Sequence, residues 1–146
     1  MRNERRQHGA FTLIEMLVVI AIIIILLGTV IAIGTNVRAS SAARQTKVIL
    51  KAMETALEGY RTSNNGVEPA SIAALLQSPE GKRVLSGLPS GTISGTTVFD
   101  GFGNQISYFR TGDTITGTVT AQRTFFRSPG PDGTANSADD MFSYDQ

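Results

Sequence analysis

The sequence predicts an α+β protein in which one long N-terminal helix packs on a small antiparallel β-sheet. An uncharged apolar run at residues 16–33 is followed, after Gly34, by apolar residues that recur every three or four positions as far as Tyr60. No proline interrupts residues 11–62. From Gly91 onward, short stretches rich in Thr, Val, Ile and Phe alternate with turn residues, a pattern typical of short strands with short connections.

The composition argues against several classes of function. The chain has 146 residues, enough for one domain plus an anchor, and its net charge of +1 is too small to favour binding of nucleic acid. It contains no cysteine, and its one histidine, His8, lies in the basic N-terminal segment. Ser–His and Cys–His nucleophiles and the usual zinc sites need those side chains. The sequence therefore predicts a protein that is not an enzyme.

Residues 1–10 and 11–34 have the compositions of a basic leader and a membrane helix. Arg2, Arg5 and Arg6 precede an apolar run that would be about 27 Å long as a helix, close to the hydrocarbon thickness of a bilayer. The arginines favour a cytoplasmic N-terminus and an external C-terminal part. A secretory signal peptide is the alternative, but its apolar core would be shorter and would lead into a small-residue cleavage site. A retained membrane helix is favoured because helical sequence continues past the run.

Glu15 is the unusual residue of this segment. A carboxylate at the start of an apolar run is costly unless it reaches the interface or meets a cation. One interpretation is an interfacial acid whose side chain extends to water. The other is that Glu15 pairs with a positive group supplied by a neighbouring subunit.

The residues GAFTLIEMLVVIAIIIIL resemble the N-terminal signature of type IV pilins and type II secretion pseudopilins. The resemblance implies that prepilin peptidase removes residues 1–10 by cutting between Ala10 and Phe11, and that the new amine at Phe11 is methylated. It also implies that Glu15, as the fifth mature residue, meets the Phe11 amine of a neighbouring subunit during assembly. The family usually has Gly directly before the cut, so cleavage after Gly9, which would make Glu15 the sixth residue, stays open.

Residues 35–66 are predicted to continue the helix as an amphipathic segment. Asn64, Asn65 and Gly66 supply a C-terminal stop, and Pro69 prevents the helix from resuming promptly. This segment should hold the globular domain, whereas the first half, apolar all round, can lie in lipid and pack against copies of itself. The predicted inward face consists of Ala39, Ala43, Thr46, Leu50, Met53, Leu57 and Tyr60.

Residues 67–146 are predicted to form a globular C-terminal domain that begins with one or two short helices within residues 69–89. Gly112 and Asp113 form a predicted hairpin turn between two strands. The sequence Asp-Gly-Phe-Gly-Asn at residues 100–104 resembles the Asp-Pro-Trp-Gly-Asn turn of the major pseudopilin, which implies a structural turn. The predicted strands are residues 97–99, 106–110, 115–120, 124–127 and 141–144.

An acidic loop at residues 128–140 is the one segment that indicates binding of a small ligand. It gathers three carboxylates, an amide, several hydroxyls and a backbone rich in Gly and Pro, whereas calcium takes about six to eight oxygen ligands. The alternative is a solvated loop, since Asp, Asn and Gly are good turn residues. The major pseudopilin has a similar loop that holds calcium, and the resemblance implies a structural calcium ion here. The implied ligands are Asp132, Asp139, Asp140, Asn136 and Ser128.

Three functions are therefore open. The resemblance implies first a major (G-type) pseudopilin, single-pass in the bacterial inner membrane with its C-terminal domain in the periplasm. It would polymerise with itself and other pseudopilins, on an inner-membrane assembly platform, into a pseudopilus that aids protein secretion. The second is a type IV pilus subunit for adhesion, motility or DNA uptake, although many such pilins close their C-terminal region with a disulfide. The third is a single-pass membrane-anchored binding domain or enzyme.

Overall fold

The computed structural model describes residues 12–145, except for the side chains of residues 29–36. The predicted leader, residues 1–10, and the predicted processing residues Ala10 and Phe11 lie outside the described residues. The chain divides into two compact units, Met1–Val37 and Arg38–Gln146, and one helix contributes to both.

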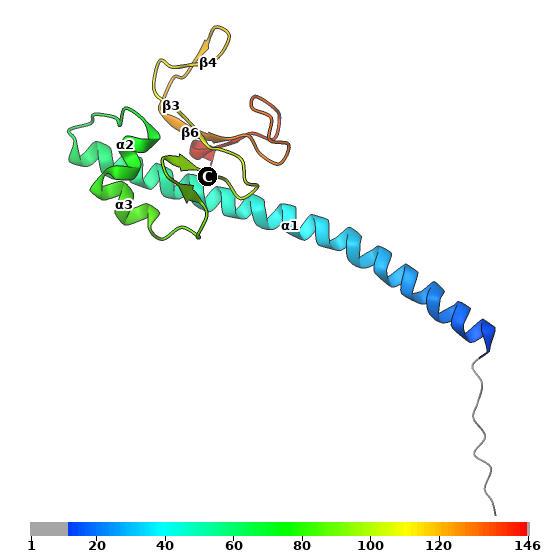
Figure 1. The fold of residues 1–146 in the computed structure, drawn as a ribbon. Coiled ribbons are helices and arrows are strands. Elements are labelled where there is room, and N and C mark those ends of the chain that lie inside the picture. Colours follow the sequence, from blue (N-terminus) through cyan, green and yellow to red (C-terminus); the bar gives the residue numbers. More distant parts are fainter. Residues whose placement is uncertain (1–11, 146) are drawn as a thin grey trace, which may run out of the picture. The chain divides into compact units, whose positions relative to one another are not determined.

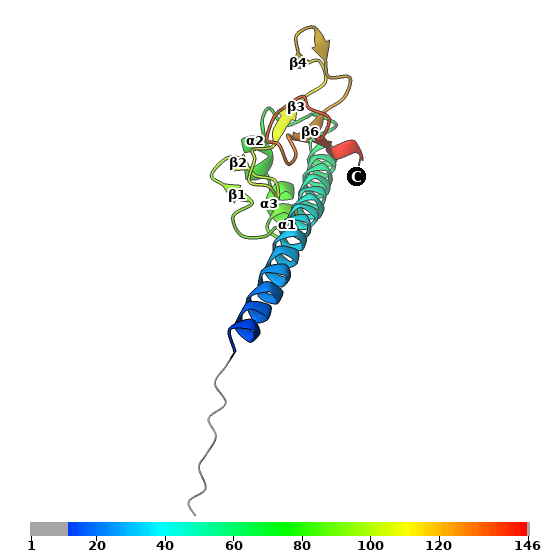
Figure 2. The same ribbon diagram turned by 90° about the vertical axis from the view of Figure 1, so that its right-hand side faces the viewer.

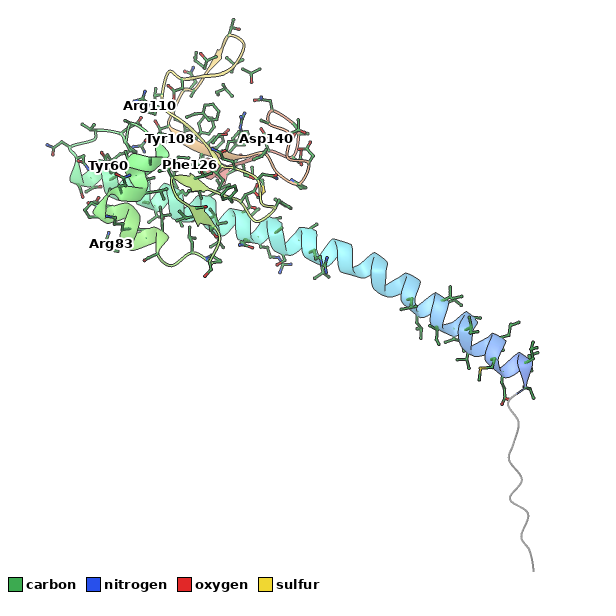
Figure 3. All side chains as sticks on the ribbon, viewed as in Figure 1. Tyr60, Arg83, Tyr108, Arg110, Phe126 and Asp140 are labelled. Carbon is green, nitrogen blue, oxygen red and sulfur yellow. The ribbon has the colours of Figure 1, made fainter. Side chains whose placement is uncertain are left out.

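Helix α1, Leu13–Ser63, is continuous, as the sequence predicts. In the first unit, every side chain from residue 13 to residue 28 is exposed, and Figure 3 shows side chains on all sides of this part of the helix. Among the helices in the described part of the chain, none is both long enough and apolar enough to cross a membrane. The predicted membrane-spanning segment, residues 11–34, includes positions outside the described residues and stays a prediction.

The helix ends where the sequence predicts. Asn65 and Gly66 have left-handed φ angles of 52° and 83°. The Gly66 N–H donates to the Arg61 carbonyl at 2.8 Å, and the Asn64 side chain donates to the Tyr60 carbonyl at 2.8 Å. These contacts satisfy carbonyl groups that the last turn leaves without helical partners.

One face of α1 forms the core of the second unit. The prediction is confirmed for the middle of this face, but Ala39 is exposed, and Ala43 and Tyr60 are only half-buried. The fully buried residues of the face are Thr46, Ile49, Leu50, Met53, Ala56 and Leu57. The residues that pack against them from the rest of the unit are Leu75, Leu85, Val98, Ile106 and Phe126.

One or two short helices were predicted within residues 69–89, and the structure has two: α2, Ile72–Gln77, and α3, Pro79–Leu85. Each begins at a serine cap: Ser71 accepts the Ala74 N–H at 3.2 Å, and Ser78 accepts the Gly81 N–H at 3.0 Å. Figures 1 and 2 both place these helices beside the C-terminal part of α1.

Within residues 12–145 the strands form three small antiparallel sheets, with orders β1-β2, β3-β6-β7 and β4-β5. The three-stranded sheet covers the core, and its Tyr108 and Phe126 rings, labelled in Figure 3, stack with centroids 5.1 Å apart. Figures 1 and 2 show the hairpin that carries β4 extending away from α1. The bounds are β1 Ile93–Ser94, β2 Thr97–Val98, β3 Ser107–Phe109, β4 Thr114–Thr116, β5 Val119–Thr120, β6 Phe125–Ser128 and β7 Met141–Phe142, followed by a 3-10 helix at Ser143–Asp145.

One strand prediction and one turn prediction are corrected, and one strand was missed. The single strand predicted at residues 115–120 is a hairpin instead, because Gly117 turns the chain with a φ of 55°. The turn at Gly112 and Asp113 does not join paired strands, since β3 pairs with β6 and β4 pairs with β5. Strand β1 was not predicted. The structural turn at residues 100–104 is confirmed: the Asp100 N–H donates to the Asn104 carbonyl at 2.9 Å.

Candidate sites at the helix N-terminus and in the acidic loop

The first turn of α1 carries a reciprocal cap. The N–H and the hydroxyl of Thr12 donate to Glu15 Oε2 at 3.0 and 3.1 Å, and the Glu15 N–H donates to Thr12 Oγ1 at 3.3 Å. This is a capping box, in which two side chains three residues apart satisfy each other's backbone N–H groups. The Thr-x-x-Glu spacing is visible in the sequence and is a signal that the predictions above did not use.

The capping box gives Glu15 a role inside its own helix. Its carboxylate is exposed at the helix N-terminus, where the helix dipole favours a negative charge. A cation brought by another chain would pair with this same carboxylate, which the cap already engages through Oε2. The predicted partner, the amine at Phe11, lies outside the described residues, and the pairing stays a prediction.

The tip of the acidic loop gathers three carboxylates around one hydroxyl. Ser137 Oγ lies 3.4 Å from Asp132 Oδ1, 2.5 Å from Asp139 Oδ1 and 3.5 Å from Asp140 Oδ1. The hydrogen bond from Ser137, followed by that from the Asp132 backbone, lowers the pKa of Asp139. A hydroxyl has only one proton to donate, so the tip concentrates negative charge that a divalent cation with oxygen ligands would neutralise. Ser137 was not among the predicted ligands.

The other two predicted ligands, Ser128 and Asn136, form hydrogen bonds with other residues of the chain. Ser128 is fully buried, and its hydroxyl donates to Asp100 Oδ2 at 2.6 Å. The side-chain oxygen of Asn136 accepts a hydrogen bond from Arg127 Nη1 at 2.6 Å. Both oxygens are therefore occupied by partners within the chain.

Arg127 is a buried cation beside the loop. Its side chain is 7% exposed, and its Nε atom lies 3.7 Å from Oδ2 of Asp140, whose side chain is 3% exposed. The guanidinium carbon lies 4.8 Å from the centroid of the Phe109 ring. Sequence reasoning missed Arg127 because an arginine at the end of a strand is ordinarily a solvated residue.

The residues of the loop fit calcium only in part. Within residues 12–145, no group of three or more His, Cys, Asp and Glu side chains is arranged so that it could hold a metal ion. Asp132 and Asp139 face the Ser137 hydroxyl and have no ion pair with a cation among the described residues. Asp140 accepts a hydrogen bond from Ser137 through Oδ1 and forms an ion pair with Arg127 through Oδ2. The donors that suit a cation are thus at the tip, at Asp132, Ser137 and Asp139.

Comparison with known proteins identifies the N-terminal segment. Residues 5–31 match the family described as the prokaryotic N-terminal methylation motif, the prepilin signal of type IV pilins and pseudopilins. No curated protein and no solved structure matches the chain. The matched residues include the predicted cleavage position and Glu15. The match supports a pilin-like subunit that is processed by prepilin peptidase, is anchored in the membrane by its N-terminus and assembles into filaments.

Proposed function

We propose that the chain is the major pseudopilin of a type II secretion system, a structural subunit and not an enzyme. The observation that carries the proposal is the prepilin motif at residues 5–31, continued by a helix whose side chains are exposed all round as far as residue 28. Such a helix buries its apolar surface only in lipid or against other copies, which suits a subunit that is stored in a membrane and then polymerised.

Two features favour a pseudopilin over a type IV pilus subunit. The chain has no cysteine with which to close its C-terminal region. In its place stand the turn at residues 100–104 and the acidic loop at residues 128–140, both of which resemble segments of the major pseudopilin. We place the domain in the periplasm, on a single-pass anchor in the inner membrane, with the assembly platform and other pseudopilins as partners.

The second candidate is a type IV pilus subunit, and the prepilin motif itself favours it equally. The two functions differ in what the filament does. Deleting the gene from its host should abolish secretion of folded proteins if the chain is a pseudopilin, whereas loss of surface pili with secretion intact would favour the pilus subunit.

Calcium is proposed to have a structural role in the acidic loop. The three carboxylates that face Ser137 supply the charge, with Asp132 and Asp139 as the principal ligands and Asp140 as a shared one. A divalent ion there would neutralise the like charges at the tip and stabilise the loop as part of a subunit contact surface. No chemical step is assigned to the ion.

The proposal is tested by co-expressing the full chain with a prepilin peptidase and measuring the intact mass and N-terminus of the membrane-bound product. We expect a chain that begins at Phe11 and carries one added methyl group. A start at Ala10 would keep the pilin-like processing but would make Glu15 the sixth residue. An uncut N-terminus, under conditions where a control pilin is cut, would contradict the proposal and favour a plain membrane-anchored domain.

The role of Glu15 needs a control for its capping box. Glu15→Gln should be cleaved normally but should lose subunit cross-linking, because the amide cannot form an ion pair with the Phe11 amine. Thr12→Val removes the hydroxyl of the cap and leaves the carboxylate in place. If Thr12→Val lowers cross-linking as much as Glu15→Gln, the cap and not the ion pair explains the requirement for Glu15.

A further inference from the structure

We infer that contacts made by the chain itself, called here the entry clamp and the exit clamp, hold the two ends of the acidic loop, residues 128–140, so that the conformation of these ends does not depend on calcium. The inference deepens the proposed function, on which it rests, by separating the parts of the loop that the protein fixes from the part that a cation would bind. The clamps are hydrogen bonds and an ion pair at the two ends of the loop. The tip, at Asp132, Ser137 and Asp139, is the part that a metal ion would bind.

The entry clamp is formed by the turn at residues 100–104. Asp100, which is 5% exposed, accepts hydrogen bonds from the Phe102 and Asn104 N–H groups through Oδ1 and from the Ser128 hydroxyl through Oδ2. Each carboxylate oxygen therefore has a donor without any metal ion. The Asn104 side chain donates to the Gly130 carbonyl at 2.8 Å, which fixes the next residues of the loop.

The entry clamp is itself attached to α1. The Gly101 N–H donates to Thr46 Oγ1 at 3.0 Å, and the Thr46 hydroxyl donates to the Ala42 carbonyl at 2.9 Å. A β-carbon at Gly101 would lie 2.2 Å from the Ala42 carbonyl oxygen, so the turn touches the helix backbone. The major pseudopilin has proline at this position of the turn. Proline has no N–H and carries a β-carbon, so neither contact is compatible with it here.

The exit clamp is Arg127. Its guanidinium donates to Asn136 at 2.6 Å and lies 3.7 Å from the Asp140 carboxylate, and both charged side chains are almost completely buried. Asp140 Oδ2 also accepts the Asn136 N–H at 2.9 Å, which closes the loop upon itself. A buried carboxylate needs a cation, and a buried arginine needs an anion, so each secures the other without a metal ion.

What remains is the tip. Asp132 Oδ1 accepts the Thr134 N–H at 2.7 Å, and Asp139 Oδ2 accepts the Asp132 N–H at 3.1 Å. These are local contacts between exposed groups, and they connect the tip to neither the sheet nor the helix. Calcium bound by Asp132 and Asp139 would therefore order the tip, while the two ends keep the order that the clamps give them.

The experiment is hydrogen exchange of the full chain in detergent, with excess calcium and with a chelator. We expect the Gly130 and Asn136 amides, which donate to Ser128 and Asp140, to exchange at rates that change less than about threefold between the two conditions. The Asp132 and Thr134 amides should slow by more than about tenfold in calcium. A wild-type loop whose ends lose protection in the chelator would overturn the inference. This comparison needs no variant.

Two variants test the clamps separately. Asn104→Ala should speed exchange at Gly130, and its control is Asn64→Ala, which removes a similar hydrogen bond to a backbone carbonyl at the end of α1. Arg127→Gln should make protection of the Asn136 amide depend on calcium, because Asp140 loses its cation and then requires another.

Arg123→Gln is the control for the charge, since Arg123 is exposed and stacks on Tyr144, 4.4 Å from the ring centroid. If Arg127→Gln leaves Asn136 protected in the chelator, Arg127 is not the clamp. The mass of each sample also reports cleavage and methylation. If the ends of the loop lose protection in the chelator while the N-terminus is correctly processed, only this inference is contradicted. If the chain is uncut while the ends of the loop keep the same protection with and without calcium, only the proposed function is contradicted.

Discussion

The two parts of α1 differ in where their apolar side chains lie. In the first unit Leu13 is 83% exposed and Ile24 is 63% exposed, whereas in the second unit Ile49 and Leu50 are completely buried. Both parts are helical and both contain many aliphatic residues. The difference is periodicity. Beyond Gly34 polar residues separate the apolar ones, so a single face is apolar and the chain can cover it.

The difference shows where each part obtains its stabilisation. Burying one large aliphatic side chain contributes about 1.5–3 kcal/mol, so the second part is stabilised within its own unit. The first part obtains no such contribution from the described chain, because its side chains are exposed all round. Under the proposed function, lipid or other subunits would supply its stabilisation.

The largest expected effect separates the two parts directly. Leu50→Ala should lower the free energy of unfolding of the second unit by about 2–5 kcal/mol, because it leaves a cavity in the core. Ile23→Ala should leave that free energy unchanged and reduce subunit cross-linking instead. Denaturant unfolding of the two variants in detergent, with cross-linking in membranes, measures both. A comparable loss of stability in the two variants would break the comparison.

The next effect concerns the contact between α1 and the turn at residues 100–104. Gly101→Ala should lower the free energy of unfolding by about 1–3 kcal/mol, because its β-carbon would overlap the Ala42 carbonyl. Gly87→Ala is the matched control, since a β-carbon there would lie 3.7 Å from its nearest neighbour, the Val84 carbonyl. Equal stabilities for the two variants in thermal unfolding would show that the helix can move away from the turn.

Much of α1 was predictable because its signals are local and long. A periodicity sustained over many turns, followed by Asn65 and Gly66 as a stop, leaves few alternatives. The capping box of Thr12 and Glu15 is equally local. The small sheets were less predictable, because strands of two to four residues hardly establish a period. In the hairpin of β4 and β5 most side chains are exposed, so no core face fixed the register in the sequence.

The acidic loop was predictable in composition and only partly in structure. Asp132, Asp139 and Asp140 are close in sequence, and the structure gathers them around Ser137. The contacts that hold the entry end of the loop come from distant residues. Asp100 is 28 residues from Ser128, and a single sequence gives no signal that they meet. Whether the carboxylates hold calcium stays a prediction.

An effect of similar size concerns the contact between Glu68 and Arg61 in the last turn of α1, and it depends on pH. Burial alone would raise the pKa of Glu68, but hydrogen bonds from Thr124 and Arg61 outweigh it and hold the pKa below its ordinary value of 4.5. The folded state therefore binds this proton less readily than the unfolded state. The stabilisation is complete above the ordinary pKa and is lost as the pH falls through the folded value.

Glu68→Gln should accordingly lower the free energy of unfolding by about 1–3 kcal/mol near neutral pH, and wild type and variant should converge as the pH falls below the ordinary pKa of 4.5 and through the lower folded value. Glu58→Gln is the control, because Glu58 pairs with the same arginine while its side chain is 61% exposed. It should change stability by less than about 1 kcal/mol. A difference between wild type and Glu68→Gln that persists at low pH would show that the carboxylate charge is not its source.

The smallest effect tests whether the first part of α1 has any stabilisation of its own. Thr12→Val removes the hydroxyl that caps the Glu15 N–H, so exchange of that amide should quicken by about fivefold, while the second unit is unaffected. Ser71→Ala is the matched control, since it removes the cap of the Ala74 N–H in α2. The alternative outcome is that Ser71→Ala accelerates exchange of the Ala74 amide but Thr12→Val leaves exchange of the Glu15 amide unchanged. In that case lipid or neighbouring subunits alone order the first turn of α1. The capping box would then matter only before the subunit reaches its surroundings.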